Sequence, residues 1–412
     1  MPSQATPQLG PVLLSGLMIG PILGSGIVIL PPLAYRTAGD WALLAWLLII
    51  LAGFCFALVF GRLSLLYPGP AGVTTAIGVA FGERVKLLTS LYLTGAVLFG
   101  PVAVMLTAAT YLCPGSPHAT WIAGGLLLIC AALLLRELRN ISRIGLIFSS
   151  LAALILGTGG LDTLLLHRAP LTAFSAFDPP AFGYALLLLF WTIVGWEVIG
   201  NYSGEVRHPQ RTIMVAVKSS ATVIGVISLI VAAAVQYGDP GIYPQAEQVT
   251  RIIAPLYGAA SGLLMGGLTL ALCTTTCLLF VGGVARLMAA LAAEGWLPAL
   301  LARRSSTGAP VPALVLLTVV HLGILGLVEA GWVGIEQLVA FADGFFLANA
   351  TIGLLTAYRL ISCRWVRLIA FALGCFFVVV FCHSPLWVIV TVLAAAGYFL
   401  VRRGPGPKAS SL

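Results

Sequence analysis

Charged side chains are scarce in this sequence. Asp, Glu, Lys and Arg together make up 8% of its 412 residues, whereas about 25% is typical of soluble domains. Hydrophobic residues make up 60%, and the mean hydropathy is +1.07. A chain with so little polar surface cannot fold as a soluble globule. We therefore predict a polytopic membrane protein that lies almost entirely in or next to the lipid bilayer.

The signatures of common enzyme and metal sites are missing as well. The sequence has no phosphate-binding loop, no dinucleotide fingerprint and no nucleophile elbow, so we expect neither an enzyme nor a bound cofactor. Its five histidines share no spacing typical of a metal site or a triad, and its eight cysteines include no C-x-x-C pair. We interpret the cysteines as small buried hydrophobes and expect no disulfide and no metal.

Long apolar segments account for most of what is present. The N-terminus has no basic region followed by a cleavage site, so we expect the first segment to be retained. Hydropathy predicts twelve segments that cross the bilayer. They lie at residues 10–36, 41–66, 86–112, 119–136, 143–166, 181–203, 212–236, 258–290, 311–328, 335–358, 364–382 and 384–401.

The basic residues determine the predicted topology. The net charge is +8, but the basic residues form short clusters between apolar segments, which is typical of membrane topology and not of nucleic-acid binding. With a cytoplasmic N-terminus, only Arg36, Arg168 and Arg251 of the 21 Lys and Arg residues fall outside. We therefore predict two cytoplasmic termini, membrane lipid as the surroundings and no nucleic-acid partner.

A break near the middle of the first apolar segment is the most informative local feature. Residues 9–35 carry no charge, yet Pro21 and the Gly-Ser-Gly run at 24–26 interrupt the helix. In lipid, such loosened backbone survives only where protein or a watery cavity satisfies its peptide groups. A second half-helix from about Ile27 would direct free N–H groups and a positive dipole end at a carboxylate. The alternative is a seam of glycines four residues apart for close helix packing.

The sixth segment repeats this peculiarity, with Gly195 and Glu197 in the middle of an apolar run. Interruptions in segments one and six predict two five-helix repeats of opposite orientation, with a substrate between them. Carbonyl groups freed near Trp191 and Val194 would accept an ammonium group. The N–H groups of Ser25, Gly26 and Ile27 would complete a clamp for a zwitterionic α-amino acid.

Several side chains at membrane depth allow two interpretations each. Glu197 acts in gating or proton coupling, or is a structural carboxylate satisfied by its neighbours. Trp191 closes over a ligand or packs against a helix. Thr275 and Thr276 help to ligate Na⁺ or bond to their own helix. Asp343 lines the path or sits near the outer end of its helix.

These residues resemble the amino acid–polyamine–organocation (APC) superfamily of transporters. The resemblance rests on residues 24–31, on residues 190–197 continuing through Glu205 to Arg211, and on residues 285–298. It covers roughly residues 10–400. Within the superfamily, the length and residues 67–82 are most similar to the YjeH-type methionine and branched-chain amino-acid exporters of bacteria.

The resemblance implies an all-α fold of twelve transmembrane helices, with a five-plus-five inverted repeat of the LeuT-like type and two further C-terminal helices. It also implies that the substrate carboxylate binds at Ser25, Gly26 and Ile27. The amino group would bind at the carbonyls of Ile22, Trp191 and Val194, next to Gly195, and Glu197 matches the family's glutamate.

Two departures from the family pattern concern coupling and the end of segment six. His208-Pro209 stands where Asn-Pro is usual, and no lysine occurs between Ile144 and Leu166. Proton coupling through a lysine in that segment therefore has no candidate. Coupling to Na⁺, protonation of Glu197 and exchange without an ion all remain open.

The predicted organisation is a cytoplasmic N-terminus (1–9), a first repeat (10–166), a second repeat (178–360), two C-terminal helices (361–401) and a disordered cytoplasmic tail (402–412). The predicted function is secondary active transport of neutral, apolar L-amino acids of the methionine, leucine, isoleucine and valine class. It takes place across a bacterial inner membrane by alternating access, in the direction of efflux. The alternatives are proton- or sodium-coupled uptake, exchange, or a non-transporting amino-acid sensor.

Overall fold

The computed structural model describes residues 10–67, 72–135, 141–170, 174–196, 206, 208–241, 244, 248–306 and 308–401. The predictions for the N-terminus (1–9), for Glu197 and for the tail (402–412) lie outside these residues.

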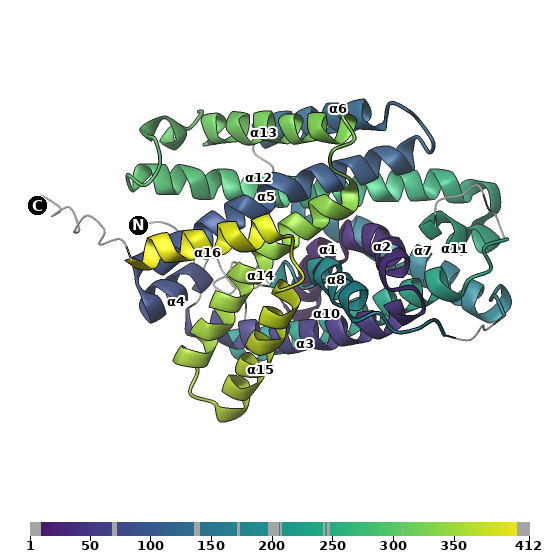
Figure 1. Ribbon diagram of the computed structural model, residues 1–412, viewed down its shortest axis with the longest axis horizontal. Coiled ribbons are helices and arrows are strands. Elements are labelled where there is room, and N and C mark those ends of the chain that lie inside the picture. Colours follow the sequence, from purple (N-terminus) through teal and green to yellow (C-terminus); the bar gives the residue numbers. More distant parts are fainter. Residues whose placement is uncertain are drawn as a thin grey trace, which may run out of the picture.

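The first half of the described chain is built from α-helices with one short 3-10 turn (Figure 1). These elements are α1 (Pro11–Leu23), α2 (Gly26–Ala38), η1 (Gly39–Trp41), α3 (Ala42–Leu66), α4 (Gly72–Phe81), α5 (Glu83–Leu112), α6 (Ala119–Leu134) and α7 (Ile141–Leu166).

The second half continues in the same way. Its elements are α8 (Pro179–Leu189), η2 (Phe190–Thr192), α10 (Pro209–Tyr237), α11 (Gln248–Tyr257), η5 (Gly258–Ala260), α12 (Ser261–Ala293), η6 (Ala299–Ala302), α13 (Val311–Glu329), α14 (Ile335–Leu360), α15 (Arg364–Phe381) and α16 (Leu386–Val401). The predicted all-α class is confirmed. Helix α11 lies in the connection between the predicted seventh and eighth segments.

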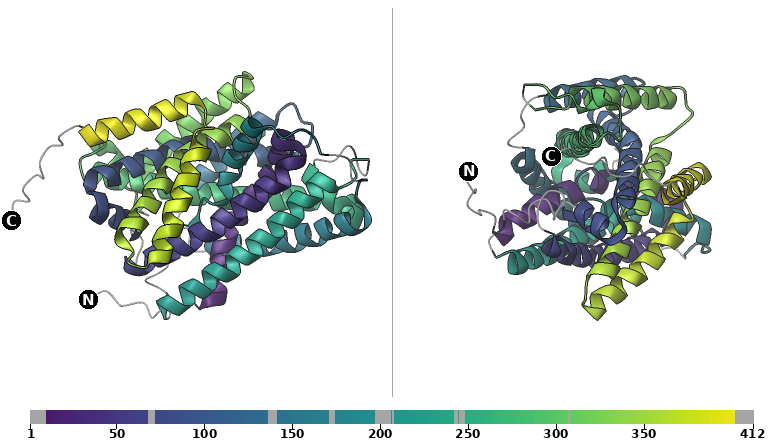
Figure 2. Two further views of the ribbon diagram at one scale, coloured as in Figure 1. Left: turned by 60° about the horizontal axis from the view of Figure 1, so that its bottom comes forward. Right: turned by 90° about the vertical axis from the view of Figure 1, so that its left-hand side faces the viewer.

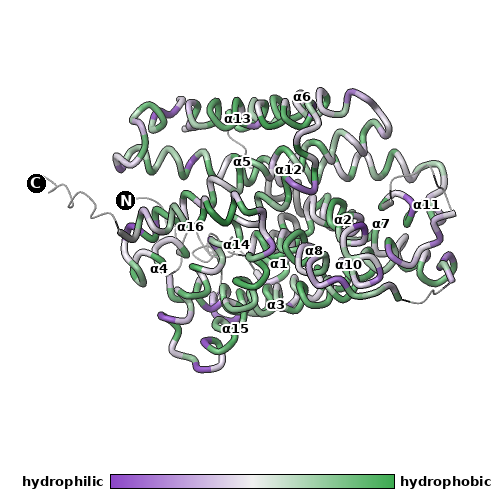
Figure 3. Tube along the Cα trace, in the orientation of Figure 1, coloured by the Kyte–Doolittle hydropathy of each residue, from purple (hydrophilic) through white to green (hydrophobic). Residues whose placement is uncertain are grey.

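Each predicted apolar segment contains helix among the described residues, but the number of membrane spans is a separate question. Eight helical stretches of the described chain are long and apolar enough to cross a membrane. Three shorter apolar helices add to them, at Ala119–Leu134, Pro179–Thr192 and Leu386–Phe399. Hydrophobic residues run along the helices, and hydrophilic ones gather mainly at helix ends and connections (Figure 3). Twelve spans and the inverted repeat therefore stay predictions.

Helix α5 runs through the interior and organises the packing around it. It contacts α12, α14, α6, α13, α4 and α16. Helices α6 and α13 lie side by side as an outer layer (Figures 1 and 2). On the other side, α3 packs against α10, and the short helices α1, α2 and α8 lie in the middle. Other helices thus surround the interrupted ones. Non-helical backbone at membrane depth needs such cover, because its peptide groups find no hydrogen-bond partner in lipid.

The first segment breaks between Leu23 and Gly26, where α1 ends and α2 begins. The prediction gave Pro21 a part in this break, but Pro21 lies inside α1, and Pro31 and Pro32 lie inside α2. The break falls at Gly24, whose φ of +21° leaves the right-handed helical range. The backbone conformation of Gly24 therefore ends α1. Pro21 does not end it, since a membrane helix tolerates a proline where neighbouring groups satisfy the freed backbone.

Pro101 shows how such a freed group is satisfied in the middle of α5. Proline has no N–H, so the Val97 carbonyl lacks its helical donor. The Nε2 atom of His321, on α13, lies 2.8 Å from this carbonyl oxygen. Since a carbonyl only accepts, Nε2 carries the hydrogen that is donated. His321 is 1% exposed, and α5 continues without a break.

His208, the residue that departs from the family's Asn-Pro, adopts a left-handed backbone with φ of +48° at the start of α10. It is the one non-glycine residue with positive φ in the described chain. Asparagine and histidine are both enriched in this conformation. The backbone geometry is therefore compatible with either residue at this position.

The eight cysteines are all free. Cys130, Cys273 and Cys277 are buried, as interpreted from the sequence. The interpretation as buried residues is wrong for Cys113, Cys363, Cys375 and Cys382, which are exposed. Cys113, Cys363 and Cys382 stand at helix ends, and Cys375 lies on an exposed face of α15.

Candidate functional site

Ser25 lies at the first break and is completely buried. Its carbonyl accepts hydrogen bonds from the N–H groups of Val28 (3.2 Å) and Ile29 (3.1 Å). Its hydroxyl has no hydrogen-bond partner among the described residues. A buried polar group without a partner costs about 1–3 kcal/mol. The hydroxyl and the first N–H groups of α2, at Gly26 and Ile27, are therefore suited to a polar ligand group.

The second break begins where α8 ends at Leu189. The Ile193 N–H donates to the Phe190 carbonyl (2.8 Å), and the Val194 N–H donates to the Trp191 carbonyl (3.2 Å). These are bonds of the tighter 3-10 type, so the α-helical pairing is lost here. The Trp191 carbonyl keeps one lone pair for another donor.

The two breaks meet at two close contacts. Gly195 has a φ of +111°, and a Cβ atom there would lie 3.3 Å from Cγ1 of Ile22. A Cβ atom on Gly26 would lie 3.2 Å from Cδ1 of Trp191. The structure thus brings predicted site residues from both segments together. Ile27 and Val194 are buried beside them.

The indole of Trp191 fills the space between two glycines. A Cβ atom on Gly100 of α5 would lie 2.9 Å from its Cη2 atom, and Gly26 lies on the Cδ1 side. Phe346 of α14 makes an edge contact, with ring centroids 6.3 Å apart. Trp191 therefore packs against helices and lies next to the first break, and its closure over a ligand stays a prediction.

Two small cavities flank Phe346. One of about 40 Å³ is lined by Phe190, Ile193 and Val194, among others, and one of about 10 Å³ is lined by Trp191 and Thr276, among others. No charged side chain lines either cavity in the described part of the chain. Small-molecule sites usually measure about 300–1,000 Å³, so the structure is closed around the breaks.

The two threonines of α12 bond to their own helix. The Thr275 hydroxyl donates to the Ala271 carbonyl (2.8 Å), and the Thr276 hydroxyl donates to the Leu272 carbonyl (2.9 Å). Their oxygens could still accept or ligate, and Thr276 lines the smaller cavity. An ion site at these residues stays a prediction.

Asp343 of α14 is 0% exposed, and neither carboxyl oxygen has a hydrogen-bond partner among the described residues. The backbone N–H of Trp191 approaches the carboxyl group without the geometry of a full hydrogen bond. Asp343 lies about 12 Å inside α14 from Ile335, at 1.5 Å per residue. The carboxyl group therefore faces the second break and not the helix end.

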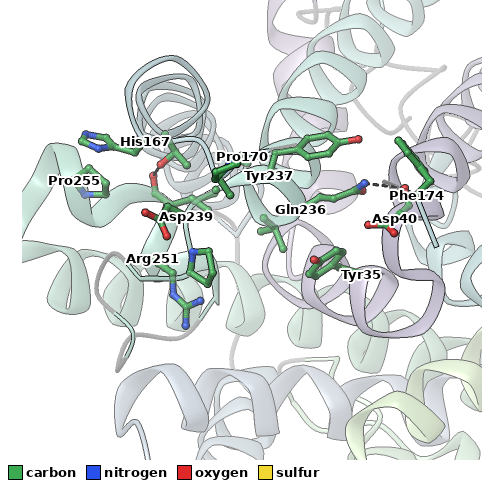
Figure 4. Close-up of a pocket in the computed structure, with 17 residues that line it drawn as sticks. Tyr35, Asp40, His167, Pro170, Phe174, Gln236, Tyr237, Asp239, Arg251 and Pro255 are labelled. Atoms are coloured by element: carbon green, nitrogen blue, oxygen red, sulfur yellow. Dashed lines mark hydrogen bonds between the residues drawn. The ribbon is translucent and has the colours of Figure 1, made fainter. Parts of the chain in front are cut away.

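A larger cavity of about 490 Å³ was not expected from the sequence. Figure 4 shows His167, Asp239 and Arg251 on one side of it and Tyr35, Asp40 and Gln236 on the other. The Gln236 amide donates to the Asp40 carbonyl (2.8 Å). Tyr35 lies about 13 Å along α2 from Gly26, so this cavity lies at the helix ends, apart from the breaks.

Over residues 9–401 the sequence matches the model of a family described as "Amino acid permease". The chain belongs to this family. The resemblance to the APC superfamily is thereby confirmed. As an amino acid permease, the protein is a multi-pass membrane protein whose substrate is a small-molecule amino acid.

Two curated relatives are similar over most of their length. The permease is 25% identical to the "Uncharacterized amino acid permease YecA" of Bacillus subtilis, over 97% of this chain and 94% of the relative. It is 24% identical to the "L-methionine/branched-chain amino acid exporter YjeH" of Escherichia coli, over 82% of each chain.

Proposed function

We propose that this permease is a secondary active transporter of neutral, apolar L-amino acids of the methionine, leucine, isoleucine and valine class. The walls at the breaks support this class, because Ile22, Ile193, Val194 and Phe346 are apolar and buried. The uncharged cavity linings beside Phe346 also favour an apolar side chain on the substrate. The printed name of the relative YjeH supports both the substrate class and the direction of efflux.

In this proposal the substrate carboxylate binds the Ser25 hydroxyl and the N–H groups of Gly26 and Ile27. The ammonium group binds the carbonyls of Ile22, Trp191 and Val194, and Gly195 leaves room for them. The observation that carries the proposal is the buried Ser25 hydroxyl without a partner at the break. Glu197 is proposed as a gate, and coupling to Na⁺ at Thr275 and Thr276 is the alternative to proton coupling.

The proposed architecture is twelve spans, with a five-plus-five inverted repeat over residues 10–166 and 178–360 and two further helices. The pairing of interrupted helices α1–α2 and α8–η2 supports it. Both termini are proposed to lie in the cytoplasm of a bacterium, with the protein in its inner membrane. Transport then proceeds by alternating access around the breaks.

The test is flux of labelled methionine, leucine and alanine in proteoliposomes, with the Ser25→Ala variant. A hydrogen bond to a charged group contributes about 1.5–3 kcal/mol, so the apparent KM should rise by about 10- to 100-fold. The matched control is Ser64→Ala. Ser64 is also buried, but its hydroxyl donates to the Gly61 carbonyl (2.9 Å), so KM should stay within about twofold.

An unchanged KM in Ser25→Ala would overturn the proposed carboxylate site. Reconstitution in both orientations, with substrate loaded on one side at a time, measures the preferred direction. Faster flux from the side that carries the termini would support efflux.

A further inference from the structure

Asp343 is the one acidic residue among the buried polar residues of the described chain. Among the Asp, Glu, His, Lys and Arg residues of the described chain, His321 is the other buried one, and it has its partner in the Val97 carbonyl. Asp343 has none for either oxygen. An ionised carboxylate without a partner at membrane depth costs several kcal/mol. The closed structure therefore requires a neutral carboxyl group or a bound cation at this point.

Three residues of α14 surround Trp191 and connect Asp343 to the second break. A Cβ atom on Gly100 would lie 2.9 Å from Cη2 of Trp191 and 3.8 Å from the Cβ of Ala342, so Ala342 lies near the tip of the indole. Phe346 contacts the indole ring by its edge, and Asp343 faces the Trp191 backbone N–H. Any movement of Trp191 that opens the site therefore changes the surroundings of this carboxyl group.

The space around the break favours a proton over a metal cation. The cavities beside Trp191 and Phe346 measure about 40 and 10 Å³, and Asp343 lines neither of them. Neither cavity therefore places a metal cation beside the carboxyl group. The nearby Thr275 and Thr276 hydroxyls are bonded to their own helix. A proton needs no volume.

Among the described residues, no other titratable group serves as a partner for the Asp343 carboxyl group. Away from the helix ends, the elements packed against α14 carry several titratable side chains among the described residues. They are Tyr184 on α8, Tyr92 on α5, Cys55 on α3, Cys273 and Cys277 on α12, Cys375 on α15 and His383 before α16, and Glu336 begins α14. Tyr92 bonds to the Val392 carbonyl (2.7 Å), and His383 to the Val379 carbonyl (3.1 Å). Tyr184 faces Glu336. The surroundings of Asp343 are set by its burial and the Trp191 N–H.

We propose that Asp343 binds the coupling proton of this transporter, an inference that rests on the proposed function. When Trp191 moves and the break opens to one side, a carboxylate oxygen of Asp343 takes a proton from hydronium and an O–H bond forms. Water is left behind. The neutral carboxyl group passes through the closed state. After opening to the other side, the O–H bond breaks and the proton returns to water.

The test compares two kinds of flux in proteoliposomes with Asp343→Asn. Asparagine keeps the shape but cannot release a proton. Accumulation of labelled substrate driven by a pH gradient should fall below a tenth of wild type, whereas exchange of substrate for substrate should stay within about threefold. Exchange should also become independent of pH between 5 and 8. Glu336→Gln, the same chemical change at the start of α14, is the control and should retain gradient-driven accumulation.

The other outcomes separate this inference from the proposed function. Wild type without any amino-acid flux would overturn both. Wild-type flux with equal gradient-driven accumulation in Asp343→Asn would overturn the inference alone, as would accumulation driven by a Na⁺ gradient at constant pH. If Asp343→Asn loses all flux, Asp343→Glu decides. Restored gradient-driven accumulation supports a proton carrier, and continued loss of flux shows a structural role.

Discussion

Two interruptions at membrane depth, Pro101 in α5 and the break at Gly24 and Ser25, have opposite outcomes. At Pro101 the freed Val97 carbonyl receives the His321 side chain, and the helix runs on from Glu83 to Leu112. At the break the helix ends, and the buried Ser25 hydroxyl has no partner among the residues that the structure describes. Where the protein supplies the missing partner, an interruption is structural. Where it does not, the interruption is a candidate place for a ligand.

The largest expected effect comes from filling the break. In Gly26→Val, a Cβ atom would lie 3.2 Å from Trp191 and 3.4 Å from Leu30, and two further methyl groups would crowd the site. Overpacking costs about 1–3 kcal/mol, so flux in proteoliposomes should fall by up to about 100-fold. Gly283→Val is the control, because no atom lies within 4 Å of that Cβ position. Equal flux in the two variants would contradict a ligand site at the break.

A second prediction removes the partner at the structural interruption. His321→Leu leaves the buried Val97 carbonyl unpaired, which should lower the free energy of unfolding by about 1–3 kcal/mol. The measurement is thermal stability of the purified protein in detergent. Adding Pro101→Ala restores a backbone N–H for the Val97 carbonyl, so the double variant should recover much of the loss. A double variant no more stable than His321→Leu would show that the histidine acts in some other way.

The smallest expected effect lies between the two interruptions, at Gly100. A Cβ atom there would lie 2.9 Å from Cη2 of Trp191, so Gly100→Ala should push the indole towards Gly26. One methyl group costs about 1 kcal/mol at the low end of overpacking, which corresponds to about a fivefold change in apparent KM. Unchanged KM together with unchanged stability would mean that the indole does not restrict the site.

Local chemistry made the first break predictable, and tertiary packing explains what the sequence missed. Glycine at 24 and 26 allows the non-helical backbone, so the position followed from the residues themselves. In the sixth segment the sequence predicted an interruption at Gly195 and Glu197, with carbonyls freed near Trp191 and Val194. The α-helix ends a little earlier, at Leu189, because packing decides which peptide groups lose their partners.

Asp343 and His321 show the same limit more sharply. Asp343 faces Trp191, and His321 serves a carbonyl freed by Pro101. In both cases the partners are far apart in the sequence and on different helices. The histidines formed no pattern in the sequence because the relevant partner of His321 is a backbone carbonyl. The larger cavity at the helix ends was missed because five separate elements (α2, η1, α7, α10 and α11) contribute residues to its lining.

The position of the Trp191 indole has a further consequence for selectivity. If the break holds the substrate, the Trp191 indole between Gly26 and Gly100 already fills part of that site. Uptake of substrate is then a displacement, and its affinity is the difference between two sets of van der Waals contacts. Glycine and alanine offer too little surface to replace an aromatic ring. Bulky aliphatic side chains and thioethers make enough van der Waals contact to replace that of the indole.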